Sequence, residues 1–463
     1  MKVHFPGFLL AGLKGGSGKT LISLGLGKNL KDKGFRVKAF KKGPDYIDAR
    51  WLGLAVQNRA SNLDPFLFSK EKVKELFYSF AYDFDFALVE GNRGLYDGKD
   101  VQGTFSSAEL AKLLNLPVIL VVDCTKITRT MAAIVLGLSQ FDPEVKIKGV
   151  ILNKTFGERH RTIVRQSIEY YTDIKVIGAL PKLKNPIPER HMGLISDQEY
   201  GSSLEQTFEK LAKVCAENID LKEVLQIAKN TPPVLLEKND IPRQNCGEKK
   251  VRIGVVLDAA FWFYYPENLH ALEQAGARLE FLSLLDHGQW PELHGLYLGG
   301  GFPETLAQKL YENVKKRQLV FDLVQNGLPV YAECGGFMFL AKSVSFNEKN
   351  YDMCGVFPYR IGVQKKPRGH GYVHGEIVAP NPFFPVGYKL KGHEFHYSCL
   401  LDEVKNKSFA LKLERGVGIC NGLDGLLYKN VFASYTHIHA LGAPEWAENF
   451  VRSAWEYKRL QSL

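Results

Sequence analysis

The segment Gly12–Thr20, Gly-Leu-Lys-Gly-Gly-Ser-Gly-Lys-Thr, constrains the chain most, because it places a glycine-rich loop between an apolar strand and a helix. Glycines let backbone N–H groups approach phosphates, and the N-terminus of the following helix adds positive potential. Leu13 stands where the usual GxxxxGK[ST] pattern has glycine, so the loop fits the variant KGGxGK[ST] instead. A glycine turn with chance lysines is the alternative, which the flanking strand and helix disfavour. The residues predicted to bind the nucleotide are Lys14, Gly15, Gly16, Gly18, Lys19 and Thr20.

Apolar strands alternate with amphipathic helical segments over the first half of the chain, which predicts a parallel sheet with helices on both faces. The predicted strands are Phe8–Leu13, Phe35–Phe40, Phe84–Val89, Val118–Asp123, Gly149–Leu152 and Val176–Leu180. A polar, proline-containing stretch at 231–250 interrupts the pattern. The pattern then restarts with the predicted strands Val251–Asp258, Leu279–Leu282, Gly295–Leu298 and Pro329–Tyr331. We predict an α/β protein with a P-loop parallel-sheet domain over 1–230, a linker over 231–250 and a second α/β domain over 251–463.

Carboxylates follow two of the predicted strands, where ligands gather in a parallel sheet. Glu90 ends one strand, and the segment Lys42–Asp48 follows another. The Thr20 hydroxyl is expected to hold Mg²⁺, and Glu90 is placed to complete the site, since Mg²⁺ prefers hydroxyl and carboxylate oxygens beside phosphates. Asp45 and Asp48 are two further carboxylates at this edge. The residues expected to bind the substrate are Asp45, Tyr46, Asp48 and Asp97. As a bare pattern the Asp-x-x-Asp loop is more often a turn, and its place at the sheet edge is what favours a site.

The segment Pro329–Gly336, Pro-Val-Tyr-Ala-Glu-Cys-Gly-Gly, runs from a strand into a glycine pair, the sequence shape of a nucleophile elbow with Cys334 as nucleophile. A thiol nucleophile needs a base, and chain order suggests the segment Ser434–His439, which carries His437 and His439. Two histidines in alternation on a strand point the same way, so a metal site and plain core or surface histidines stay open as alternatives. The segment Gly299–Glu304 supplies N–H groups suited to an oxyanion or a substrate carboxylate.

Composition argues against several classes of protein. No apolar run reaches the roughly 18 residues that a membrane span needs, and the first apolar stretch leads into the glycine loop instead of a cleavage site. Seven cysteines without CxxC spacing argue against a disulfide framework or a structural zinc site. The formal net charge of +10 forms no dense basic block, so it fits an anionic substrate as well as a solvated surface. We expect a cytoplasmic protein with small-molecule partners, without nucleic acid or membrane, and with a homodimer as one oligomeric option.

Motifs from both halves occur in the order seen in cobyrinic acid a,c-diamide synthases, which the chain resembles from residue 8 to about 452. They are AGLKGGSGKT, KKGPDYID, EGNRGLYDG, AAFWFYYPENL, LYLGGGFPE, YAECGG, GHEFHYS and ASYTHIH. The resemblance implies a dethiobiotin-synthetase-like ATP domain followed by a class I glutamine amidotransferase-like, flavodoxin-like domain. It also implies that ATP and Mg²⁺ serve to activate the a and c acetate carboxylates of a corrin precursor. Glutamine hydrolysis at Cys334, with His437 as base, then supplies ammonia. The resemblance further implies that Glu90 and Asp45 join Thr20 around Mg²⁺. His439 stands where many class I amidotransferases carry a glutamate.

Two departures from the family pattern keep the tetrapyrrole substrate open. LKGGSGKT replaces a TSSGVGKT-type loop, and EGNRGLYDG replaces the more usual EGVMGLFDG. Related enzymes carry out the same chemistry on nickel-sirohydrochlorin or sirohaem, and cobyric acid synthase amidates other side chains. A MinD/ParA-like ATPase switch is a further alternative, which Lys14 supports but the thiol motifs do not.

Overall fold

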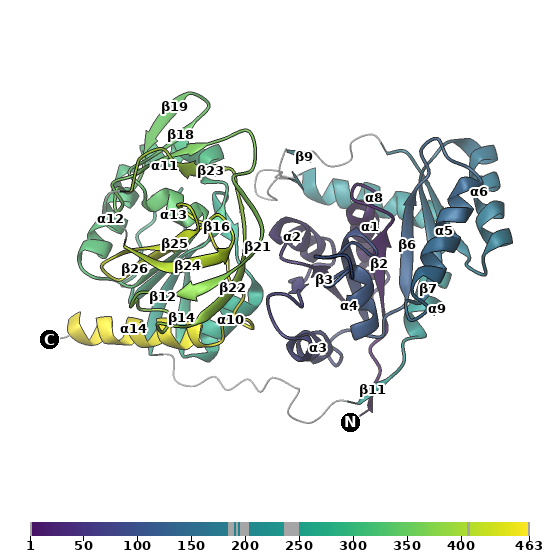
Figure 1. The fold of residues 1–463 in the computed structure, drawn as a ribbon, viewed down its shortest axis with the longest axis horizontal. Coiled ribbons are helices and arrows are strands. Elements are labelled where there is room, and N and C mark those ends of the chain that lie inside the picture. Colours follow the sequence, from purple (N-terminus) through teal and green to yellow (C-terminus); the bar gives the residue numbers. More distant parts are fainter. Residues whose placement is uncertain are drawn as a thin grey trace. The chain divides into compact units, whose positions relative to one another are not determined.

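A computed structural model describes residues 2–183, 189–190, 193–194, 203–235, 250–404 and 408–461 (Figure 1). The chain divides into two compact units, Met1–Pro242 and Arg243–Leu463. Each unit has its own large sheet. Most of the predicted linker, residues 236–249, lies outside the described residues.

The first unit contains a parallel sheet, whose described strands are ordered β4-β3-β5-β2-β6-β7-β8. They are β2 (Gly7–Gly12), β3 (Val37–Lys42), β4 (Ser61–Leu63), β5 (Phe86–Gly94), β6 (Val118–Asp123), β7 (Ile147–Thr155) and β8 (Val176–Pro181). The chain runs outward from β2 to β3 and β4, returns to β5, and then continues through β6 to β8 in the other direction. The direction of the connections thus reverses beside β2 and β5, and in such sheets ligands bind outside the carboxyl ends of the strands at the reversal.

Helices follow these strands and cover both faces of the sheet (Figure 1). Crossovers between parallel strands are right-handed, so the outward connections lie on one face and the connections that run the other way lie on the opposite face. The helices are α1 (Lys19–Asp32), α2 (Tyr46–Ala55), α3 (Lys70–Ser79), α4 (Ser107–Leu113), α5 (Thr130–Phe141), α6 (Gly157–Tyr171), α8 (Leu204–Asn218) and α9 (Leu221–Lys229). Short strands form two further pairs, β1 (Lys2–Val3) with β11 (Val234–Leu235) and β9 (Glu189–Arg190) with β10 (Gly193–Leu194).

Two predicted strands are displaced toward their carboxyl ends in the structure. β3 ends at Lys42 instead of Phe40, and β5 ends at Gly94 instead of Val89. Both extensions bury charge, since Lys41 is 2% exposed and Glu90 is 0% exposed. The two side chains form an ion pair of 2.7 Å between Nζ and Oε1. Bounds based on apolar runs end too early here, because burial of a charge depends on a partner that is distant in sequence.

The second unit contains a mixed sheet, whose described strands are ordered β14-β12-β15-β17-β26-β25-β24-β21-β22. The parallel part consists of β14 (Ala277–Leu282), β12 (Val251–Val256), β15 (Gly295–Leu298), β17 (Val330–Glu333) and β26 (Val431–Ser434). The antiparallel part consists of β25 (Leu423–Tyr428), β24 (Phe409–Arg415), β21 (Gly369–Ile377) and β22 (Lys389–His396). The prediction of two α/β domains is confirmed, although the antiparallel extension was not predicted.

Smaller elements complete the second unit. The short strands are β13 (Phe261–Phe263), β16 (Gly300–Gly301), β18 (Ser343–Phe346), β19 (Lys349–Asp352), β20 (Arg360–Val363) and β23 (Ser398–Leu400). The helices are α10 (Pro266–Gln274), the 3₁₀ helix η3 (Pro303–Leu306), α11 (Ala307–Glu312), α12 (Val314–Gln325), α13 (Gly335–Leu340) and α14 (Glu445–Gln461). A core lies on each face of the main sheet, and β17 contributes Tyr331 to one core and Ala332 to the other. This alternation is expected for neighbouring residues of a strand.

Candidate functional site

The predicted phosphate loop connects β2 to α1 and adopts a conformation that requires glycine. Gly16 and Gly18 have φ values of 72° and 94°, and a Cβ at Gly18 would lie 2.1 Å from Nδ2 of Asn153. Gly18 caps α1 without a side-chain hydrogen bond, so the first N–H groups of the helix are available to a phosphate. Ser17 Oγ donates to the carbonyl of Lys14 (2.9 Å), and Asn153 Nδ2 donates to the carbonyl of Ser17 (2.8 Å). The loop is therefore held from both sides.

The two lysines of the loop have different environments. Lys19 is 7% exposed, and its ammonium donates to the carbonyl of Arg93 (2.8 Å) at the end of β5. Burial and the charge of Lys41 lower the pKa of Lys19. Lys14 is exposed. A negative ligand in the loop would compensate the buried charge of Lys19, whereas Lys14 is already solvated.

Glu90 and Thr20 meet at the carboxyl edge of the sheet. Thr20 Oγ1 donates to Glu90 Oε1 (2.8 Å), and Lys41 Nζ donates to the same oxygen (2.7 Å) and to Asp48 Oδ2 (2.5 Å). Burial alone would lower the pKa of Lys41, but the charges of Asp48, Glu90 and Asp45 outweigh it and raise that pKa. Lys41 is thus a permanent cation that holds two carboxylates beside the phosphate loop.

The environment of Glu90 fits a magnesium ion. Its second oxygen, Oε2, is buried and has no hydrogen-bond partner in the described part of the chain. A buried carboxylate oxygen without a donor is costly, and a cation would satisfy it. Mg²⁺ commonly takes one or two carboxylates, a hydroxyl and phosphate oxygens. The described residues contain no group of three or more His, Cys, Asp and Glu side chains that could hold a metal by themselves.

Asp45, Tyr46 and Asp97 lie on the loops around this edge but contact different groups. Asp45 Oδ1 caps α2 by accepting from the backbone N–H of Asp48 (2.9 Å), and Tyr46 is the first residue of that helix, 8% exposed. Burial, with the nearby charge of Asp48, raises the pKa of Asp45 to about 6. Asp97 is exposed and accepts from the backbone N–H of Gly94 (2.8 Å). These contacts give Asp45 a structural role in α2, whatever else it binds.

Cys334 lies at a sharp turn between β17 and α13. Its φ and ψ are 47° and −96°, a strained conformation for a residue with a side chain. Its backbone N–H donates to the carbonyl of Ser434 (2.6 Å), which ties the turn to the end of β26. Strain of this kind is typical of a nucleophile elbow. Burial, followed by the charges of Glu304 and Glu333, raises the pKa of the Cys334 thiol, so the thiol needs a base to ionise.

A glycine-rich strand lies against both the elbow and His437. A Cβ at Gly300 would lie 2.6 Å from Cε1 of His437, and a Cβ at Gly335 would lie 3.1 Å from the backbone nitrogen of Gly301. A Cβ at Gly336 would lie 2.3 Å from the carbonyl oxygen of Leu298. Gly300 and Gly336 therefore have no room for a side chain and Gly335 has little, so the elbow, the strand and the imidazole approach closely. Such an arrangement of backbone N–H groups suits an oxyanion.

The two histidines do not lie on a strand, contrary to the prediction. β26 ends at Ser434, and the following backbone leaves the sheet because Asp424 accepts from the N–H groups of Tyr435 (3.0 Å) and Thr436 (2.9 Å). His437 then pairs with His393 through backbone hydrogen bonds, and their rings stack with centroids 5.0 Å apart.

The rings of His437 and His439 face different carboxylates. His437 Nδ1 lies 3.4 Å from Glu333 Oε2, and His439 Nε2 lies 3.5 Å from Glu267 Oε2. The two histidines therefore do not form one site.

Sequence reasoning missed two charged residues of these sites, Lys41 and Glu333. Each directly precedes residues that the sequence analysis singled out: Lys41 precedes the segment Lys42–Asp48, and Glu333 precedes Cys334. The available signal was a charged residue at the end of an apolar strand. Such a residue has to be paired if it is buried.

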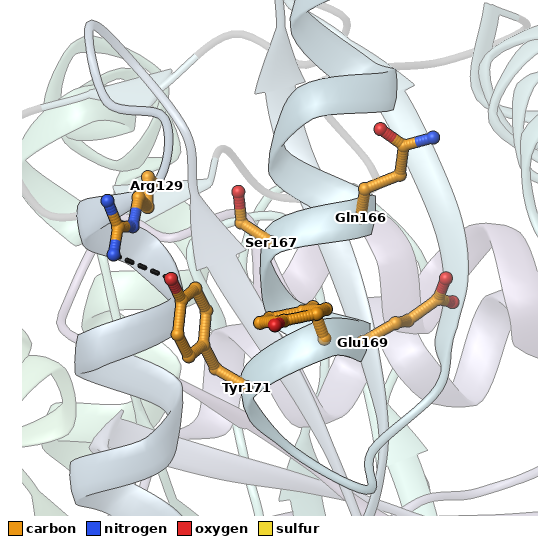
Figure 2. Close-up of a pocket in the computed structure, with 6 residues that line it drawn as sticks. Arg129, Gln166, Ser167, Glu169 and Tyr171 are labelled. Carbon is orange, nitrogen blue, oxygen red and sulfur yellow. Dashed lines mark hydrogen bonds between the residues drawn. The ribbon is translucent and has the colours of Figure 1, made fainter.

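A cavity of about 660 Å³ lies on the first unit and is lined by residues of α6 and the start of α5. Figure 2 shows the guanidinium of Arg129 donating to the hydroxyl of Tyr171 (2.6 Å). Tyr170 forms another part of its wall and is 82% exposed. None of the residues predicted for either site lines this cavity.

Comparisons with known proteins identify a family for each of the two units. Residues 8–195 match the family described as CobQ/CobB/MinD/ParA nucleotide binding domain, and residues 252–445 match the CobB/CobQ-like glutamine amidotransferase domain. No helix among the described residues is long and apolar enough to cross a membrane.

Curated relatives match the chain over almost its whole length. A cobyrinate a,c-diamide synthase from Magnetococcus marinus is 39% identical over 98% of this chain and 98% of its own. Enzymes of the same name from Caldanaerobacter subterraneus subsp. tengcongensis (40% identical, 96% of this chain and 97% of its own) and Archaeoglobus fulgidus (37% identical, 99% of both chains) match similarly. The expected resemblance is confirmed. The chain belongs to the cobyrinate a,c-diamide synthase family, which joins a nucleotide-binding domain to a glutamine amidotransferase domain.

Proposed function

We propose that the protein is an ATP- and glutamine-dependent ligase that amidates the a and c acetate carboxylates of cobyrinate. The observation that carries the proposal is the presence of two candidate sites in one chain. One is a phosphate loop beside a buried carboxylate, and the other is a thiol on a strained turn, packed against a glycine-rich strand that also lies against a histidine. Relatives named cobyrinate a,c-diamide synthase align with both.

The first unit activates the carboxylate. Lys14, Lys19 and the N–H groups of Gly15, Gly16 and Gly18 bind the phosphates of ATP. A substrate carboxylate oxygen attacks the γ-phosphorus, ADP leaves, and an acyl phosphate forms. Thr20, Glu90 and Asp45 would hold Mg²⁺, and the bound ion would offset negative charge on the phosphates. Support for this ligand set comes from the unsatisfied Oε2 of Glu90.

The substrate binds along the loops after β3 and β5. We assign Asp45, Tyr46, Asp48 and Asp97 to this surface. The tetrapyrrole carries many carboxylates, so the acidic groups of this surface have to be offset, and Lys41, which is buried against Glu90 and Asp48, offsets two of them. Asp48 is already paired with Lys41 (2.5 Å), which keeps one carboxylate of the surface from repelling the substrate.

The second unit releases ammonia from glutamine. His437 takes the proton of the Cys334 thiol, and the thiolate attacks the side-chain amide carbon. The proton returns to the leaving nitrogen, and NH₃ departs. Water then opens the thioester to glutamate. The N–H groups of Gly301 and Gly335 stabilise the oxyanion, and the released NH₃ displaces phosphate from the acyl phosphate.

We place the enzyme in the cytoplasm with tetrapyrrole, glutamine and ATP as its partners, and a homodimer is the oligomer to test. Mass spectrometry of the products formed from cobyrinate, nickel-sirohydrochlorin and sirohaem tests the substrate. We expect a gain of two amides on cobyrinate only.

Cys334→Ser should lose glutamine-dependent synthesis while retaining synthesis with concentrated ammonium at raised pH. ATP hydrolysis that is independent of glutamine and of every tetrapyrrole would favour an ATPase switch instead.

A further inference from the structure

A histidine that removes a proton with one ring nitrogen needs a defined hydrogen-bond partner on the other, because the partner fixes the tautomer. His439, two residues after His437, is directed to Glu267 on α10, with 3.5 Å between Nε2 and Oε2. His439 has no carboxylate of its own to offer His437, and the carboxylate that it faces is Glu267. The partner that orients His437 therefore has to be found elsewhere in the fold.

Glu333 places a carboxylate against His437. Its Oε2 lies 3.4 Å from His437 Nδ1, a long contact of the kind that shortens when substrate binds. Its Oε1 accepts from the backbone N–H of Ile438 (3.2 Å), one residue further along, and Tyr297 donates its hydroxyl to Oε2 (3.1 Å). Glu333 is 0% exposed. The carboxylate is held on three sides and contacts both the ring and the backbone of the His437 segment.

Two other described neighbours of His437 do not supply this function. His393 stacks on the ring, and burial together with the charges of His437 and His439 lowers its pKa, so it remains neutral. Phe263 approaches the ring edge with centroids 6.4 Å apart and carries no charge. The acidic group that these contacts bring to the imidazole is Glu333.

We infer that Glu333 is the positioning residue of the glutaminase site. It keeps Nδ1 of His437 protonated, leaves Nε2 to accept the thiol proton, and stabilises the imidazolium that follows. The residue that precedes the nucleophile thus orients the base. The inference rests on the proposed roles of Cys334 and His437.

Glu333→Gln separates this role from a structural one. The Ile438 N–H requires the amide oxygen of the new side chain, so the NH₂ group is directed at Nδ1 and favours the tautomer with a protonated Nε2. We expect the kcat of glutamine hydrolysis to fall by about 10²-fold or more, with the KM for glutamine within about threefold. Synthesis from ammonium should stay within about twofold of wild type. Glu333→Asp, which retains a carboxylate, should recover about tenfold of the lost kcat.

Glu267→Gln is the matched control, since it makes the same change at the buried glutamate facing His439. Its kcat should stay within about threefold of wild type. An unchanged kcat in Glu333→Gln, or an equal loss in Glu267→Gln, would overturn the inference. If Glu333→Gln does not fold, Glu333→Asp carries the test: its shorter side chain moves the carboxylate away from Nδ1, so its kcat should be about tenfold below wild type, and a wild-type kcat would overturn the inference. Cys334→Ala tests the proposed function separately from the role of Glu333, because glutamine hydrolysis in that variant would refute the proposed function itself.

Discussion

The two candidate sites differ in how they carry charge. At the phosphate loop, buried cations and anions are already in contact, since Lys41 pairs with Glu90 and Asp48. At the thiol, the nucleophile is buried and its pKa is raised, so it is neutral until a proton moves. The first site is polarised before its ligands arrive, which favours binding of phosphates. The second develops charge only during the reaction, so changes there should act on kcat more than on binding.

The largest expected effect is the loss of function at the phosphate loop while the thiol site stays intact. Lys19→Ala removes the cation that would contact the β- and γ-phosphates. Synthesis should fall by about 10³-fold with either glutamine or ammonium, because activation precedes nitrogen delivery. Glutamine hydrolysis, measured as glutamate released, should remain. Ammonium-dependent synthesis at the wild-type rate would refute the phosphate-loop assignment.

The converse experiment breaks the second site and spares the first. Gly300→Ala introduces a Cβ that would lie 2.6 Å from His437 Cε1, so the imidazole has to move. We expect a loss of about 10²-fold in glutamine-dependent kcat, with ammonium-dependent synthesis unaffected. Gly288→Ala is the control, because its nearest neighbour atom is 3.5 Å away. Equal activities in the two variants would argue against a role for His437 at this position.

Loss of the charge balance at the first site should lower the stability of the first unit. Lys41→Met leaves Glu90 and Asp48 without their cation, and we expect the first unit to lose about 3 kcal/mol of unfolding free energy. Thermal unfolding without nucleotide measures this, and Mg²⁺ with ATP should restore part of the loss. Lys72→Met is the control, since its pair with Glu75 is exposed and contributes at most about 0.5 kcal/mol. A midpoint unchanged from wild type would show that the buried pair adds nothing.

The smallest effect sharpens the comparison at the phosphate loop. Asn153→Ala removes the hydrogen bond from Nδ2 to the carbonyl of Ser17 (2.8 Å), which braces the loop without contacting its chemistry. A bond of about 1 kcal/mol predicts a rise of about fivefold in the KM for ATP, with little change in kcat. Initial rates at varied ATP measure both. A fall in glutamine hydrolysis of the same size would indicate a global defect instead.

The sequence prediction rested on patterns of residues that are close together in the chain, and it was limited where a role depends on residues far apart in the chain. The glycine loop, the parallel strands and the Cys334 turn each depend on residues close together in sequence, and the two α/β units followed from them. Lys41 and Glu333 were missed because their roles depend on partners 49 and 104 positions away. The antiparallel strands β21 and β22 were missed because their histidines, glycines and lysines lack an apolar pattern. The path after β26 was missed because one side chain, Asp424, replaces the hydrogen bonds of a strand.

That path after β26 also affects how the second unit responds to substitution. On a strand, residues 437 and 439 would share one face and one set of neighbours, and a change at one would disturb the other. Because the backbone turns away under Asp424, each ring has its own carboxylate. A substitution at position 439 should therefore act first on Glu267 and on Tyr265, whose ring contacts His439, while the orientation of His437 depends on Glu333.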